Sequence, residues 1–176
     1  MTGGSCASAA WSYIAQKQGL DVRDFRGGRS RDFFSNTLNL NKMSKMNGIK
    51  ALTAEGGSPA TVGNRLLKKC EEGREYYLCV GRHAAIVRRN EGRLQYLELQ
   101  SQYLNGWRNF DAKSPRKTLM RRFGCSSASD GGISEMFDFM IDIKESDFST
   151  KEFQSLMGHI NTEVSAQRKG AAGFAK

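Results

Sequence analysis

A hairpin pattern in the middle of the chain restricts the fold more than any other feature. Apolar and polar side chains alternate on both sides of Asn90-Glu91-Gly92. Alternation with a period of two residues is typical of a strand, and a short turn containing glycine joins antiparallel neighbours. Two further apolar segments have strand character. The sequence therefore predicts an antiparallel sheet with strands at residues 76–80, 83–89, 93–101 and 137–143.

Helical patterns flank these strands in the sequence. Ser5 is a good N-cap, and apolar residues at helical spacing after it predict a helix over about residues 6–18. The same periodicity predicts a helix over residues 61–72. A capping box at residues 149–152 precedes a final apolar stripe formed by Phe153, Leu156, Met157, Ile160 and Val164. The predicted fold class is α+β, with the opening helix packed on the antiparallel sheet.

The chain length and composition indicate one globular domain. The chain has 176 residues, of which 39% are hydrophobic and 26% charged. That is enough apolar material for a single well-filled core. We expect one domain over residues 1–168, with residues 20–60 as a loop-rich insertion, and a flexible tail over residues 169–176.

The charge balance suggests acidic partners without identifying one. Lys and Arg number 27 against 18 acidic residues, which gives a net charge of +9. One cluster lies at residues 23–31 and another at residues 116–122, and neither is interleaved with a nucleic-acid motif. We expect solvated basic faces, an acidic protein partner or anionic membrane surface in preference to nucleic acid, and no metal or cofactor.

The sequence contains no targeting or membrane-spanning pattern. It has no run of about 18 apolar residues, and its beginning lacks the basic and apolar regions of a signal peptide. A protein injected into a target cell by specialised machinery would also lack them. We therefore expect either secretion or injection without a classical signal peptide, or a cytoplasmic location.

Cys6 is the strongest candidate nucleophile among the four cysteines, which we expect to be free thiols. It falls in the first turn of the predicted opening helix, where the helix dipole and unpaired backbone N–H groups favour a thiolate. The same N–H groups can stabilise a developing oxyanion. The alternative is that Cys6 is a small buried residue beside Ala7 and Ala10.

His83 supplies a candidate general base. If Ala84 and Ile86 face the core together with Leu97, His83 shares the opposite face with residues 96, 98 and 100. A two-residue loop places His83 opposite Gln100, and a four-residue loop places it opposite Glu98. Either partner could orient the imidazole, which a general base requires. The alternative is a solvated sheet face that carries these polar residues by chance.

These segments resemble the papain-like cysteine hydrolases, in particular compact bacterial toxin and effector domains. Gly4-Ser5-Cys6 followed by Trp11 is similar to their nucleophile helix, residues 82–87 to their histidine strand, and residues 97–100 to their third-residue segment. The resemblance implies that Cys6 attacks a carbonyl carbon, that His83 transfers the proton and that Glu98 or Gln100 orients His83.

The resemblance has two departures and implies a function class. Glu98 stands where the family has Asp, and no upstream glutamine is present to donate to the oxyanion. The implied activity is an amide hydrolase, namely a protein glutamine deamidase, a protease or a peptidoglycan amidase, that acts as a secreted toxin or effector. A protein substrate and an immunity or activating protein are the implied partners. The alternative function is a non-catalytic basic module that binds nucleic acid or an acidic protein.

Overall fold

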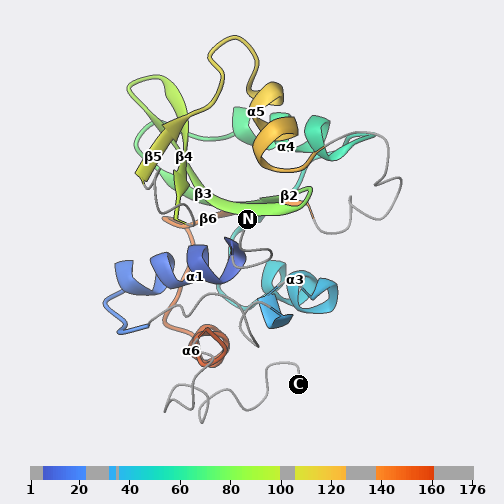
Figure 1. Cartoon of the computed structure of the whole chain (residues 1–176). Coiled ribbons are helices and arrows are strands. Elements are labelled where there is room, and N and C mark those ends of the chain that lie inside the picture. The colour runs from blue at the N-terminus through green and yellow to red at the C-terminus, as the bar shows by residue number, and fades with distance from the viewer. Residues whose placement is uncertain (1–5, 23–31, 35, 100–105, 126–137, 161–176) are drawn as a thin grey trace. The chain divides into compact units, whose positions relative to one another are not determined.

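The computed structural model describes residues 6–22, 32–34, 36–99, 106–125 and 138–160. The chain divides into two compact units (Figure 1). One unit consists of Met1–Ile49 and Ser146–Lys176, and the other of Lys50–Glu145. The predicted tail at residues 169–176 and the basic cluster at residues 23–31 lie outside the described residues.

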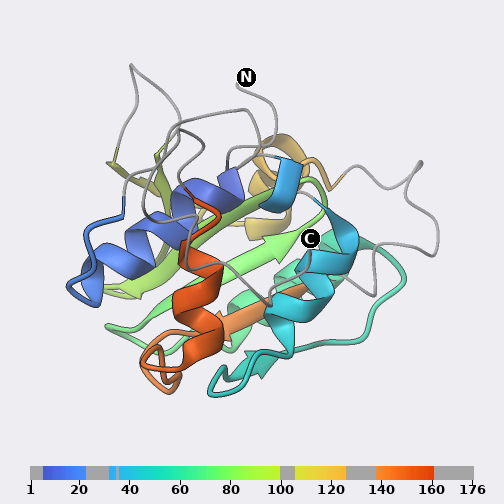
Figure 2. The same ribbon diagram turned by 90° about the horizontal axis from the view of Figure 1, so that it is seen from below.

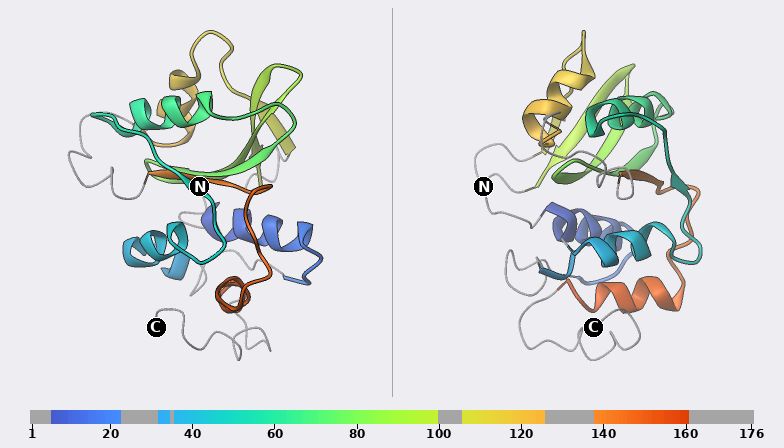
Figure 3. Two further views of the ribbon diagram at one scale, coloured as in Figure 1. Left: turned by 180° about the vertical axis from the view of Figure 1, so that it is seen from behind. Right: turned by 90° about the vertical axis from the view of Figure 1, so that its right-hand side faces the viewer.

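The unit Lys50–Glu145 contains a six-stranded antiparallel sheet, which confirms the predicted α+β class. The strand order is β1-β6-β2-β3-β4-β5. Helices α4 and α5 both cover one face of this sheet (Figures 1 and 3). The elements of the unit are β1 (Ala51–Leu52), α4 (Pro59–Lys68), β2 (Glu75–Val80), β3 (His83–Asn90), β4 (Arg93–Glu98), β5 (Gly106–Asn109), α5 (Pro115–Arg122) and β6 (Phe139–Asp142).

The β3–β4 hairpin has the two-residue loop, the first of the two registers predicted. Val87 pairs with Tyr96, and Asn90 pairs with Arg93. Glu91 and Gly92 form the loop with φ of 52° and 74°. Positive φ at both loop residues is the geometry that matches the twist of two antiparallel strands.

Both faces of the sheet are buried in its central strands, which corrects the expectation of a single core-facing side. Ala85, Val87 and Tyr96 pack into the apolar core beneath α4 and α5, and this is the face that begins at His83. On the other face Ile86 is fully buried, and Leu97 is 8% exposed. The alternative of a solvated face around His83 is therefore wrong.

The unit formed by the two ends of the chain is helical in its described part. It contains α1 (Cys6–Lys17), α3 (Thr37–Ser44) and α6 (Lys151–Met157), and Figure 2 shows α6 beside α1. The Trp11 ring of α1 lies 6.2 Å from the Phe153 ring of α6, and both side chains are fully buried. The prediction of the opening helix is confirmed.

The start of α6 differs from the predicted capping box. The N-cap is Thr150, whose side chain accepts from the N–H of Phe153. The hydroxyl of Ser149 instead donates to Oδ1 of Asp147 at 2.6 Å. Glu152 instead accepts from the backbone N–H of Asn47 at 2.9 Å. The helix ends at Met157, so the predicted apolar stripe extends beyond the end of the helix.

Several elements lie in segments that carried no clear pattern. β1, β5 and α5 were not predicted, and α4 begins at Pro59 and ends at Lys68, earlier than the predicted helix at both ends. Ser58 caps α4 by accepting from the N–H of Thr61. None of the helices in the described part of the chain is both long and apolar enough to cross a membrane.

Candidate functional site

Cys6 differs from the other three cysteines in its exposure. It is the first residue of α1 and is half-buried, whereas Cys70, Cys79 and Cys125 are buried. All four are free thiols. Burial raises the pKa of Cys70 to about 12, so that thiol stays protonated near neutral pH. A position at a helix start has the opposite tendency, because the helix dipole favours the thiolate.

His83 is the first residue of β3 and lies at the end of an apolar core. It pairs with Val80 of β2. Its ring packs edge-on against the Phe123 ring, with centroids 5.0 Å apart and an interplanar angle of 76°. The imidazole is half-buried. One side of the ring therefore contacts hydrocarbon, which fixes its position.

A tight turn held by two distant segments sets the start of β3. Gly81 has a φ of 59°. Its N–H donates to Oδ1 of Asp138 at 3.1 Å, and the N–H of Arg82 donates to the carbonyl oxygen of Phe123 at 2.9 Å. Asp138 and Phe123 are both buried. The sequence pattern around His83 gave no sign of this support, because its two acceptors follow the hairpin by tens of residues.

The electrostatic state of His83 involves one of its two predicted partners. Burial lowers the pKa of His83 below its ordinary value, and the negative charge of Glu98 opposes that shift. The structure thus brings Glu98, the last residue of β4, into interaction with the imidazole. Gln100 lies outside the described residues, so its orienting role stays a prediction.

We expect the Glu98→Gln substitution to lower the pKa of His83 further. Removal of the carboxylate charge leaves the desolvation of the imidazolium unopposed, and both effects disfavour the charged ring. Titration by NMR of the imidazole protons measures this. The chain has two histidines, so the resonance missing from a His83→Asn variant identifies His83.

The same shift predicts a pH dependence of stability. An unfolded chain binds a proton at His83 below a pH of about 6.5, while the folded chain resists it. The free energy of unfolding should therefore fall as the pH drops from about 6.5 to the lower folded pKa, and His83→Asn should remove this contribution.

A pKa of His83 that rises in the Glu98→Gln variant would contradict the assigned interaction between Glu98 and the imidazole.

The remaining candidates divide between the two units. His83 and Glu98 belong to the unit Lys50–Glu145, and Cys6 belongs to the other unit. The pairing of Cys6 with His83 therefore stays a prediction. His159 stacks on the Phe33 ring at 3.8 Å, a packing role. Within the described ranges, no group of three or more His, Cys, Asp or Glu side chains could hold a metal ion.

Comparisons with protein-family models, curated proteins and solved structures found no match to this chain.

Proposed function

We propose that this protein is a cysteine-dependent amide hydrolase of papain-like type, with Cys6 as nucleophile, His83 as general base and Glu98 or Gln100 as the orienting group. Its substrate would be a protein glutamine side chain, a peptide bond or a peptidoglycan amide. The proposed setting is that of a secreted or injected toxin or effector. An immunity or activating protein is the proposed regulatory partner.

The observation that carries the proposal is the placement of His83, whose ring packs against Phe123 and whose turn is held by Asp138 and by the carbonyl oxygen of Phe123. Its imidazole has a lowered pKa and interacts with the Glu98 carboxylate. A neutral imidazole near pH 7 can accept a proton, and a nearby carboxylate stabilises the imidazolium that results. Glu98 thus gives His83 an electrostatic partner in addition to its packing against Phe123. The half-buried thiol of Cys6 at the start of α1 supplies the matching nucleophile.

The proposed reaction has two steps that share one intermediate. His83 takes the proton of Cys6 as the sulfur attacks the carbonyl carbon. The C–N bond then breaks, and the leaving ammonia or amine receives that proton from the imidazolium, which leaves an acyl thioester. In the second step His83 takes a proton from water, the resulting hydroxide attacks the thioester, and the Cys6 thiol is restored with a carboxylic acid as product. Backbone N–H groups at the start of α1 would stabilise both oxyanions.

Selective alkylation of Cys6 tests the paired thiol and imidazole directly. An ordinary thiol with a pKa of about 8.5 is almost entirely protonated near pH 6. We expect iodoacetamide to label Cys6 at about pH 6 much faster than the three buried cysteines. We expect the His83→Ala substitution to slow this labelling by about tenfold or more, because the imidazole that takes the proton of the Cys6 thiol is then absent. Peptide mass spectrometry measures each rate separately.

The other histidine provides the matched control. His159→Gln also removes one imidazole, and it should leave the rate of Cys6 labelling unchanged. If His83→Ala and His159→Gln have the same effect, or if Cys6 reacts no faster than a free thiol, the proposed pair is wrong.

A further inference from the structure

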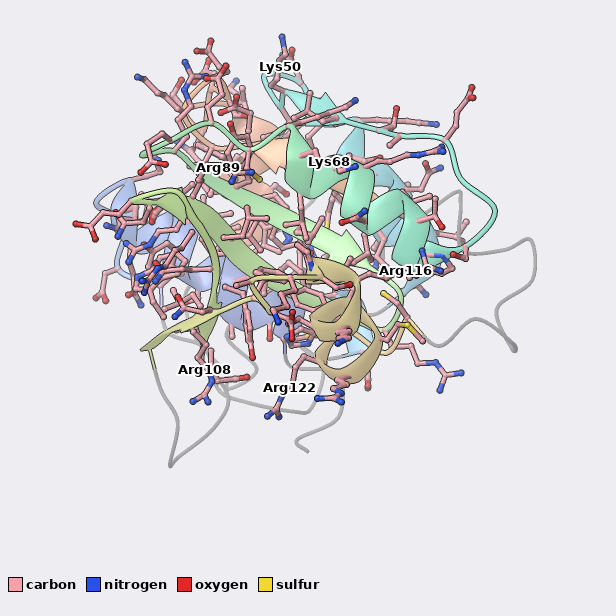
Figure 4. All side chains as sticks on the ribbon, turned by 90° about the horizontal axis from the view of Figure 1, so that it is seen from above. Lys50, Lys68, Arg89, Arg108, Arg116 and Arg122 are labelled. Atoms are coloured by element: carbon pink, nitrogen blue, oxygen red, sulfur yellow. The ribbon has the colours of Figure 1, made fainter. Side chains whose placement is uncertain are left out.

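A cavity of about 750 Å³ lies within the unit Lys50–Glu145, apart from His83. It is bounded by α4, by the β3–β4 hairpin and by the segment that leads from β5 into α5. Figure 4 looks onto this face of the sheet and labels three of the cationic residues that line the cavity. The basic lining residues are Lys68, Arg89, Arg93, Lys113 and Arg116.

The two half-buried arginines are held in place without losing their charge. Nε of Arg89 donates to the carbonyl oxygen of Cys70 at 3.1 Å. Nη1 of Arg116 donates to the hydroxyl of Thr61 at 2.9 Å. Both acceptors are neutral, so each guanidinium keeps a full positive charge. Each also keeps further N–H groups in the planar arrangement that suits a phosphate or carboxylate.

Salt bridges do not neutralise the cavity. Among the described residues, none of the five basic side chains that line it makes a salt bridge, whereas Arg74, outside the lining, pairs with Glu71, Asp142 and Glu145. The lining therefore carries five positive charges against one negative charge, that of Asp111, a balance of +4. Charges of one sign that converge in a concave site attract a ligand of the opposite sign.

The one acidic residue of the lining is already engaged by the backbone. Oδ1 of Asp111 accepts from the N–H groups of Lys113 at 3.0 Å and Ser114 at 2.9 Å. These hydrogen bonds lower the pKa of Asp111. Ser114 is the N-cap of α5, and its own side chain makes no capping hydrogen bond. The positive end of the α5 dipole thus adds to the charge of the basic side chains.

The size and floor of the cavity favour a small ligand. Leu67 is fully buried, Phe110 is 4% exposed, and Leu94 packs against the same core, so the apolar part of the lining belongs to the packed core of the unit. A volume of about 750 Å³ lies in the range of small-molecule sites. Nucleic acid and acidic proteins are bound over larger surfaces than this cluster of five cations offers.

We propose that this cavity binds a small group that carries two or more phosphates, either as a soluble polyphosphorylated molecule or as the headgroup of a lipid. The negatively charged oxygens of the phosphates would meet the half-buried guanidinium groups of Arg89 and Arg116 and the exposed side chains of Lys68, Arg93 and Lys113. This site is independent of the proposed Cys6 chemistry.

Isothermal titration with tripolyphosphate tests the site. We expect saturable binding at about 0.15 M salt and a rise in Tm as ligand is added. Arg89→Gln and Arg116→Gln should each weaken binding by about tenfold or more, because each removes charge-assisted hydrogen bonds. Arg122→Gln is the matched control: it removes the same charge from the same helix as Arg116, outside the cavity, and should change the affinity less than about twofold.

Exposed rim variants keep the test decisive if an arginine variant fails to fold. Lys68→Glu and Arg93→Glu change side chains that are exposed, and both should weaken tripolyphosphate binding. Lys69→Glu, also exposed and next in sequence to Lys68, should not, because Lys69 does not line the cavity. The rate of Cys6 labelling should be the same in all of these variants, which separates this proposal from the proposed hydrolase.

Vesicles distinguish the two sources of the phosphates. Phosphatidylcholine vesicles with about 5 mol% of a phosphatidylinositol bisphosphate should compete with tripolyphosphate if the ligand is a lipid headgroup, and should not bind if it is soluble.

Three results would overturn the proposal. They are no saturable tripolyphosphate binding, an equal loss of tripolyphosphate affinity in Arg122→Gln and Arg116→Gln, or tighter binding of a single-stranded oligonucleotide with an affinity that grows with its length.

Discussion

The Cys6→Ala variant should lose amide hydrolysis by a factor of about 10⁴ or more while it remains folded. Loss of the nucleophile removes the covalent step itself, so no neighbouring group can replace it. Cys6 is half-buried, so the truncation removes little packed volume. The measurement is the growth of cells that express the wild type or the variant in each compartment. Mass spectrometry of their proteins then detects a one-dalton gain from deamidation or a new cleavage.

Cys70→Ala is the control for the loss of a thiol. Cys70 is buried, its pKa is about 12, and its Sγ contacts Sδ of Met140 at 3.7 Å. Its truncation should cost about 1–2 kcal/mol of stability, because it leaves a small cavity, and should leave turnover unchanged. If Cys6→Ala harms cells as the wild type does, the nucleophile is not Cys6.

The hairpin that carries His83 could be predicted because its information is local. Alternating residues define the two strands, and Glu91-Gly92 supplies a turn that tolerates positive φ. The alternation places His83 on one face with Tyr96 and Glu98, but it leaves two loop lengths open, and the structure has the two-residue loop. The helix that begins at Cys6 was predictable for the same reason, since its cap and apolar spacing are contiguous.

Elements that depend on distant contacts could not be predicted. Half of the residues of helix α5 are basic, and only Thr118 and Leu119 within it are buried, so its sequence has almost no apolar stripe. Strand β5 has four residues, too few to establish a period. The burial of both faces could not be predicted either, because an antiparallel sheet commonly leaves one face to solvent, whereas Ile86 and Val87, on opposite faces, are both fully buried here.

The surroundings of His83 could not be predicted from the sequence for the same reason. Its ring contacts Phe123, its turn is held by Asp138, and neither residue belongs to the hairpin. A sequence pattern identifies the type of residue that begins a strand, whereas the groups that fix its rotamer and pKa come from elsewhere in the fold. The basic cavity was missed for a related reason, since its cations come from α4, β3, the β4 strand start and the α5 region.

The Gly81→Ala substitution should destabilise the protein by about 3 kcal/mol or more. At a φ of 59° an L-residue is already strained. A Cβ at Gly81 would lie 2.7 Å from the carbonyl oxygen of Phe123 and 2.8 Å from Sγ of Cys125, and both neighbours are fully buried. The carbonyl cannot retreat without breaking its hydrogen bond from Arg82. Denaturant unfolding measures the loss of stability. The pKa of His83, measured by NMR, should also change, because the turn positions the imidazole.

Gly73→Ala separates the two causes of that loss. Gly73 has a φ of 77°, close to that of Gly81, but nothing lies within 4 Å of an added Cβ. Gly73→Ala should therefore lower the free energy of unfolding by only about 1 kcal/mol, the cost of placing an L-residue in the left-handed conformation. It should leave the pKa of His83 unchanged. The difference between the two losses of unfolding free energy measures how closely the turn packs against Phe123 and Cys125. Equal losses of stability in the two variants would mean that this turn is not packed as described and that His83 lacks the support assigned to it.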